Sequence, residues 1–192
     1  MTRPEALQTL QVYTKAPNLI RHHLAVEAAM RAIARLYNAR THGFINEEFW
    51  GLTGLLHDAD YELTRNTPKK HSLYLEEKIG KILPPEVMYA IKAHNYKYTG
   101  LPPKSPMDWA LYTCDELTGF IIMSALSQKN KRLLTVNAEM VLKNMQDQNF
   151  AKNVDRTQIL LCEGQLGIPI REYVGVVLAS MQAIAIDLGF EG

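Results

Sequence analysis

The chain has 192 residues, of which 47% are hydrophobic and 21% are charged, and these proportions are ordinary for a globular protein. Its length is enough for one sizeable core, and we expect a single domain that spans residues 1–192. The formal net charge of +1 argues against a protein that binds polymeric nucleic acid or an anionic membrane through overall electrostatic attraction.

Cysteine usage and hydropathy indicate a soluble protein of a reducing compartment. Cys114 and Cys162 form no CxxC motif, so we expect neither a disulfide framework nor a cysteine-rich zinc site. The sequence begins without the apolar core of a signal peptide. The most apolar stretch, residues 174–186, is too short and too interrupted to span a bilayer. We therefore expect a cytoplasmic protein that has no membrane partner.

Helical signals dominate the first part of the chain. Thr2 is expected to cap a short helix that has Pro4 in its first turn. Asn18 is expected to cap a longer helix, which carries a stripe of inward-facing residues at helical spacing. The stripe consists of Leu19, His23, Val26, Met30, Ile33 and Tyr37. Asn46 is expected to cap a third helix, which leads to His57.

Two further helices are expected in the middle of the chain. Pro68 fits the first turn of one helix, which carries His71 and is ended by Gly80 or by the prolines that follow. The other helix covers residues 86–94 and places His94 on its apolar side. A histidine that continues an apolar side of a helix is expected to face the interior.

The remaining part of the chain is also expected to be helical. A polar and proline-rich loop at residues 95–103 precedes Ser105-Pro106-Met107-Asp108, which has the pattern of a capping box with proline at the first helical position. The helix that follows presents Asp115 on an otherwise apolar face, so its carboxylate requires a counter-charge. Later helices are expected at residues 137–145, 156–163 and 169–188.

These patterns predict an all-α protein, because no convincing stretch alternates apolar and polar residues as a half-buried strand does. We expect a single-domain helical bundle with its core at about residues 18–128. Residues 129–192 are expected to add C-terminal helices to that core rather than to form a second domain, because no long linker divides the two parts.

The pair His57-Asp58 follows a run of apolar residues, where an imidazole beside a carboxylate packs poorly but can hold a metal ion. Borderline divalent ions are bound by imidazoles and carboxylates that converge from different elements. Matching residues on other expected helices are His22 or His23, His71, His94 and Asp115. Periodicity places His23 on the apolar stripe and His22 beside small alanines, and it leaves open which of the two is a ligand.

With these residues in this order, the chain resembles the HD-domain superfamily of metal-dependent phosphohydrolases, and in particular its small HDIG-type predicted hydrolases. The resemblance covers the whole chain and implies an all-α fold of the HD-domain type. It is carried by His22 with Val26, Leu55 to Asp58, His71, His94, and Ala110 to Glu116. The Ile-Gly of the HDIG name is absent, since Ala59-Asp60 follows His57-Asp58, and this departure leaves the subgroup and the substrate open.

The resemblance implies roles for the candidate residues. It assigns four ligands to a primary metal, and these are His22, His57, Asp58 and Asp115. It assigns His71 and His94 to a second metal or to the phosphate of the substrate, and it makes them candidate catalytic residues together with Asp58. One or two divalent ions are expected, from among Mn, Fe, Mg, Ni, Co and Zn. Candidate phosphate-binding residues, chosen because they are close in sequence to these histidines, are Lys69, Lys70 and Lys97.

The resemblance thus implies a metal-dependent phosphohydrolase that acts on a small phosphate ester, such as a nucleotide, through a metal-activated water. Two alternatives use the same residues: a dinuclear-iron oxygenase of the HD type, and a non-catalytic module that binds a metal or a nucleotide. A third is a helical interaction protein with scattered histidines. The neighbouring acids Asp60 and Glu62 are expected to lie in a solvated loop.

Overall fold

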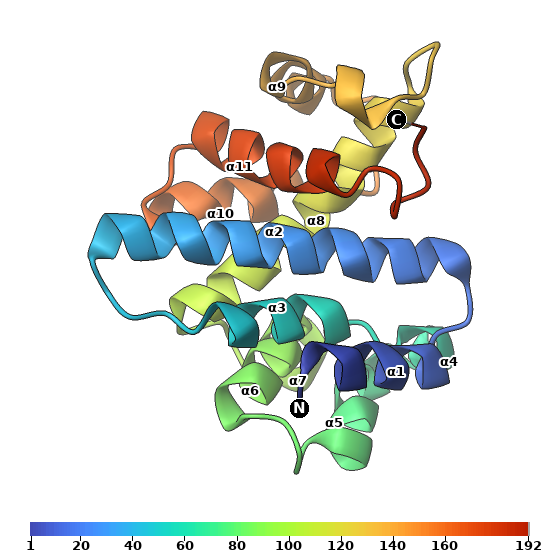
Figure 1. The fold of residues 1–192 in the computed structure, drawn as a ribbon, viewed down its shortest axis with the longest axis vertical. Helices are drawn as coiled ribbons and strands as arrows, with labels where there is room; N and C mark the ends of the chain where they lie inside the picture. The colour runs from blue at the N-terminus through green and yellow to red at the C-terminus, as the bar shows by residue number, and fades with distance from the viewer. Residues whose placement is uncertain (192) are drawn as a thin grey trace.

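The computed structural model describes residues 1–191, and these residues form helices and turns but no strand (Figure 1). In chain order the helices are α1 (Arg3–Tyr13), α2 (Pro17–Thr41), α3 (Glu47–Leu56), α4 (Tyr61–Thr64), the 3₁₀ turn η1 (Pro68–Lys70), α5 (Leu73–Ile79), α6 (Pro85–His94), α7 (Tyr96–Thr99), α8 (Pro106–Leu126), the 3₁₀ turn η2 (Leu133–Thr135), α9 (Ala138–Gln146), α10 (Arg156–Leu166) and α11 (Ile170–Ala183). Within the described part of the chain, none of these helices combines the length and the apolar character that crossing a membrane requires.

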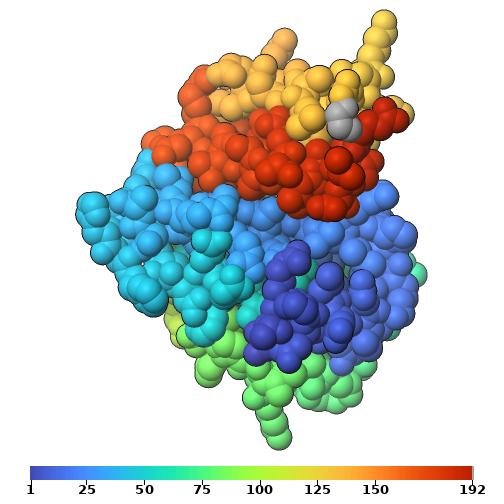
Figure 2. Space-filling model, viewed as in Figure 1, coloured from blue at the N-terminus to red at the C-terminus, as the bar shows by residue number. Residues whose placement is uncertain are grey.

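Helix α2 crosses the middle of the molecule and organises the elements around it (Figure 1). It packs against α3 on one side and against α11 on the other, and α8 crosses behind it. Helix α8 in turn contacts α6 and α10. The space-filling view shows the C-terminal helices, in orange and red, resting directly on the blue segment that contains α2 (Figure 2). The helices α2, α3, α6 and α8 therefore lie close together, although α6 and α8 are far from α2 and α3 in sequence.

The α2–α3 crossing is close because small residues meet there. Ala25 and Ala29 of α2 are fully buried. A Cβ atom added to Gly54 of α3 would lie 2.7 Å from the carbonyl oxygen of Val26 and 2.9 Å from the backbone nitrogen of Glu27. Glycine is therefore required for this close approach of two backbones. The crossing brings the end of α3, where His57 lies, against the first half of α2.

Several expected helix starts are confirmed, because the cap residues make the predicted hydrogen bonds. The Asn46 side chain accepts from the Glu48 N–H, and the Ser105 side chain accepts from the Asp108 N–H. Thr2 precedes α1 as predicted. The prediction for Asn18 was wrong: α2 begins at Pro17, since proline with its fixed φ occupies the first helical position, and Asn18 already lies inside the first turn.

The helix that was expected to start at Pro68 is interrupted at His71, one of the candidate ligands. Pro68 starts a single 3₁₀ turn that ends at Lys70, and α5 begins only at Leu73. His71 and Ser72 lie between the two elements, and Ser72 has a positive φ of 69°. The prediction that His71 lies on a helix was therefore wrong, because the chain makes a sharp turn at that point.

Two other boundaries differ from the predictions. The segment 95–103 was expected to be a loop, but it contains the short helix α7, which Gly100 ends with a φ of 71°. The last helix was expected to reach residue 188, but it ends at Ala183 and the chain continues in turns. The helices expected at residues 137–145 and 156–163 are present as α9 and α10.

Candidate metal centre

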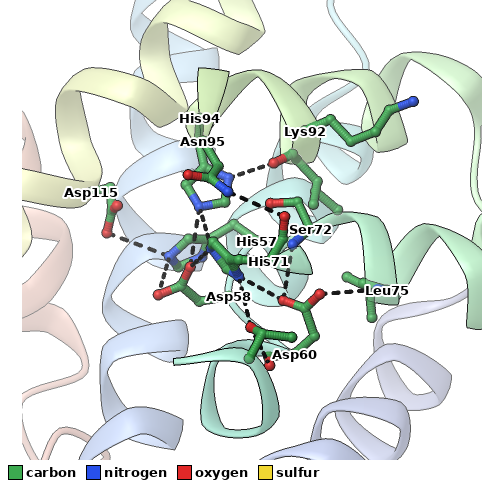
Figure 3. A network of polar contacts seen from close by, with 12 residues as sticks. His57, Asp58, Asp60, His71, Ser72, Leu75, Lys92, His94, Asn95 and Asp115 are labelled. Carbon is green, nitrogen blue, oxygen red and sulfur yellow. Dashed lines mark hydrogen bonds and ion pairs between the residues drawn. The ribbon is translucent and has the colours of Figure 1, made fainter. Parts of the chain in front are cut away.

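The six candidate ligands meet beside the end of α3 (Figure 3). They are supplied by five segments: His22 by α2, His57 and Asp58 by the end of α3, His71 by the turn before α5, His94 by the last residue of α6, and Asp115 by α8. Figure 3 shows His57, Asp58, His71 and His94 pointing toward one another, with Asp115 approaching from α8.

One group of these side chains surrounds His57. An Asp115 carboxylate oxygen lies 2.9 Å from His22 Nε2 and 3.4 Å from His57 Nε2. The second oxygen of Asp58 lies 3.7 Å from the same His57 nitrogen. His57 is fully buried, whereas the side chains of His22 and Asp115 are 21% and 23% exposed. The group therefore has a closed side at His57 and a side that solvent reaches.

A second group surrounds the other oxygen of Asp58. Asp58 Oδ1 lies 2.9 Å from His71 Nε2 and 3.1 Å from His94 Nε2, and the two imidazole nitrogens are 3.1 Å apart. These three atoms form a nearly equilateral triangle. The shared carboxylate of Asp58 thus has one oxygen in each group, so the two groups form one continuous cluster.

The separations between these atoms match those of ligands around one ion. Nitrogen and oxygen ligands bind zinc at about 2.0–2.2 Å, and bonds of that length at octahedral or tetrahedral angles put neighbouring ligand atoms roughly 2.8–3.6 Å apart. The triangle of Asp58, His71 and His94 falls in this range, as does Asp115 with His57. The donor set of imidazoles and carboxylates suits borderline divalent ions.

The hydrogen bonds of the imidazoles orient their Nε2 atoms toward the centre. Nδ1 of His57 lies 2.8 Å from the Gly54 carbonyl oxygen, and Nδ1 of His94 contacts the Ile91 carbonyl in the same way. Because a carbonyl oxygen only accepts, each Nδ1 carries the proton and each Nε2 is left with its lone pair in the neutral ring. The His57 Nε2 atom is buried and makes no hydrogen bond. A buried nitrogen that makes no hydrogen bond is costly, and a cation bound among this nitrogen and the nearby oxygens of Asp115 and Asp58 would satisfy it.

His23 occupies a different place from His22. It is buried on α2, and its ring lies 5.2 Å from the ring of His57 between centroids. Burial, joined by the nearby charge of His57, lowers the pKa of His23 well below its usual value, so this imidazole is neutral. His22, not His23, contributes to the first group of candidate ligands. His23 instead packs behind His57.

The carboxylates set the charge of the cluster. Burial acts to lower the pKa of His57, but the charges of Asp58 and Asp115 outweigh it and raise this pKa to about 9. At His71 burial is likewise outweighed by Asp58 and Asp60, and its pKa rises to about 10. Burial would raise the pKa of Asp58, yet the adjacent imidazoles hold it well below its usual value. Without a cation the cluster therefore compensates its carboxylates with protons, which a metal would have to displace.

Asp60 is a member of the cluster that sequence reasoning missed. It was expected in a solvated loop, but it is fully buried and contacts Nδ1 of His71 at 2.7 Å. Glu62, two residues later, is partly exposed at the protein surface and accepts from the backbone N–H of Lys15 at 2.7 Å. The local sequence pattern does not distinguish these two acids. Only the tertiary packing of the turn around His71 does so.

The three candidate phosphate-binding lysines are exposed. Lys69 and Lys70 lie on η1, and Lys97 lies on α7, which packs against η1. Asn95 joins the two segments, since its side-chain amide donates to the carbonyl oxygen of His71 at 3.2 Å. These cations therefore lie on segments directly next to His71 and His94. The ammonium group of Lys97 stands over the ring of Tyr98.

Comparisons with protein-family profiles, with curated proteins and with solved structures found no match for this chain. The resemblance to the HD-domain superfamily therefore stays a prediction that depends on the residues quoted above. What the fold and the centre define directly is an all-helical protein with clustered histidines and aspartates able to hold a metal ion.

Proposed function

We propose that this chain is a cytoplasmic, metal-dependent phosphohydrolase of the HD-domain type, which acts on a small phosphate ester such as a nucleotide. The observation that carries the proposal is the sharing of Asp58 between two groups of ligand atoms. Phosphoryl-transfer sites commonly hold two adjacent cations that bind the attacking and the leaving oxygens. A carboxylate with one oxygen in each group has the form that such a site needs.

The accessible side of the centre is the side from which a substrate would approach. His57 is fully buried and closes the cluster from behind, whereas Asp58, His22 and Asp115 have side-chain exposures of 18%, 21% and 23%. His94 and His71 are less exposed, at 7% and 11%. Solvent therefore reaches these five side chains to some extent, whereas it does not reach His57.

The chemistry follows from the donor set. A divalent cation in this position would lower the pKa of a coordinated water and offset negative charge on the phosphoryl oxygens. Asp58 stays ionised, because the adjacent imidazoles hold its pKa low, so it can accept a hydrogen bond and orient a water. His71 and His94 would bind a second cation or the phosphate. The exposed ammonium groups of Lys69, Lys70 and Lys97 would attract and hold the anion.

Elemental analysis of the purified protein, combined with a phosphatase screen over nucleotides and generic esters, tests this proposal. We expect bound divalent metal and release of inorganic phosphate, both lost in His57→Ala. The matched control is His42→Ala, which removes an exposed histidine that takes no part in the cluster and should change neither result.

Each other outcome of this experiment rejects the proposal in a distinct way. Bound iron with consumption of oxygen and no release of phosphate would assign the site to a dinuclear-iron oxygenase. Stoichiometric nucleotide binding without turnover would assign it to a non-catalytic binding module. A protein that takes up no metal, even when it is supplied in excess, would leave a helical protein with a purely structural histidine cluster.

A further inference from the structure

Asp60 forms three short contacts, all inside the protein (Figure 3). Its Oδ1 atom lies 2.7 Å from His71 Nδ1 and accepts from the Ser72 backbone N–H at 3.2 Å. Its Oδ2 atom accepts from the Leu75 backbone N–H at 3.0 Å. Asp60 has no exposed surface, so this carboxylate does not contact solvent or substrate. Its role must be exerted through the groups that it contacts.

The segment that Asp60 holds has an unusual backbone. Ser72 is fully buried and has a φ of 69°, which L-residues other than asparagine and aspartate rarely adopt. Ser72 precedes α5 but makes no capping hydrogen bond with its side chain, and its hydroxyl oxygen has no hydrogen-bond partner. Asp60 supplies the missing cap from outside the helix, because Leu75 is the third residue of α5.

His71 differs from His57 and His94 in what holds its Nδ1 atom. Nδ1 of His57 and of His94 each contact the backbone carbonyl three residues earlier, within or at the end of a helix. His71 has a ψ of 137° and lies outside the helices, so its Nδ1 atom does not make this contact with the carbonyl three residues earlier. The carboxylate of Asp60 takes the place of the helical carbonyl.

We propose that Asp60 is a positioning residue of the candidate centre, which fixes the His71 ring with its proton on Nδ1 and its Nε2 lone pair directed at the ion. This inference rests on the proposed function. A carboxylate can only accept a hydrogen bond, so its contact with Nδ1 selects the tautomer in which Nε2 is free to bind metal. The two backbone N–H groups hold the carboxylate in place, so its orientation does not depend on the histidine.

Asp60→Asn tests the proposal with little change in volume. Asparagine has one acceptor oxygen and one NH₂ group, so it cannot accept hydrogen bonds at both terminal atoms, as the two oxygens of Asp60 do. Loss of a carboxylate partner of a ligating histidine typically weakens metal binding about 10–100-fold. We therefore expect Asp60→Asn to weaken Co²⁺ binding at the group of Asp58, His71 and His94 by this factor. The measurement is a titration of the full-length protein against a competing chelator, together with the visible absorption spectrum of bound Co²⁺.

Asp108→Asn is the matched control. Asp108 is also buried and also accepts from two backbone N–H groups, those of Lys104 and Ser105, but it contacts no histidine. Thermal unfolding in a chelating buffer reports the structural cost of each substitution without metal. We expect both variants to melt earlier than the wild type, and only Asp60→Asn to change the affinity for Co²⁺ and its spectrum.

The outcomes separate this inference from the proposed function. Wild-type affinity and spectrum in Asp60→Asn would overturn the role of Asp60 and leave the proposed function intact. An equal loss of affinity in Asp108→Asn would also overturn it, because the effect would then be a general one of the fold. A wild-type protein that binds no Co²⁺ would overturn the proposed function and, with it, the inference.

Discussion

The close contact of α2 and α3 at Gly54 makes a sharp prediction about the candidate centre. In Gly54→Ala the new Cβ atom would meet the Val26 carbonyl oxygen at 2.7 Å and the Glu27 backbone nitrogen at 2.9 Å. Ordinary contacts begin at 3.4 Å, and these neighbours are backbone atoms that cannot rotate away. The helices must therefore separate by roughly 0.5–0.7 Å, as expected for a well-packed interior.

The magnitude of the effect follows from this displacement. Overpacking of a core costs about 1–3 kcal/mol, while alanine gains about 1 kcal/mol over glycine in a helix. Gly175→Ala, on α11, is the matched control because its Cβ would meet nothing within 4 Å. This variant therefore gains helix propensity without the cost of overpacking. For a domain of this size 1 kcal/mol corresponds to about 2–4 °C in Tm. Gly54→Ala should therefore melt roughly 2–12 °C below Gly175→Ala.

The same displacement should reach the metal ligands. His57 follows α3 and His22 lies on α2, so a separation of the two helices moves these ligands apart. Metal sites tolerate deviations of only about 0.2 Å in ligand distance. We expect Gly54→Ala to bind metal more weakly than Gly175→Ala, as measured by chelator competition alongside thermal unfolding. Equal melting temperatures and equal affinities in the two variants would refute the reasoning.

Three further predictions concern single side chains. Asp58→Asn should lose both metal binding and phosphatase activity, because Asp58 belongs to both groups of ligands, and a metal content equal to that of the wild type would contradict this. Glu27→Ala should destabilise the fold by about 1–2 kcal/mol in a denaturant titration, because the buried carboxylate accepts from the Arg3 guanidinium at 2.7 Å and from Arg31 at 3.0 Å, while Arg3 is half exposed and Arg31 keeps its pair with Glu48. Neither Cys114 nor Cys162 should react with a thiol reagent in the folded protein at pH 8, since burial raises the pKa of both, that of Cys162 to about 12. Thiolate would form only as the pH approaches these raised values, and prompt reaction of either thiol at pH 8 would contradict this prediction.

Much of the helical pattern was predictable because its determinants are local. The caps at Asn46 and Ser105 are hydrogen bonds over two or three residues, and such signals are present in the sequence itself. Asp115 was expected on an apolar face that requires a counter-charge, and it lies against two imidazoles. The start of α2 was misjudged because proline and asparagine compete for neighbouring positions there.

The environment of His71 was not predictable, because it depends on contacts distant in sequence. Asp60 lies 11 residues away from His71, and the turn at Ser72 is held by that buried carboxylate. Periodicity describes only residues on one helix, and it is silent about a turn whose conformation is set from outside. The same reason explains why Asp60 was expected in solvent: an acid is placed inside a protein by its partners, not by its neighbours in sequence.

The central claim is that imidazoles and carboxylates from five segments surround a cation. Anomalous X-ray scattering from crystals of the protein grown with Mn²⁺ tests it most directly. We expect an anomalous peak within bonding distance of His57 Nε2 and of the Asp58 carboxylate, enclosed by the other ligands of the cluster. A well-ordered structure that places Mn²⁺ only elsewhere, or that shows these side chains paired with one another and no ion between them, would contradict the account.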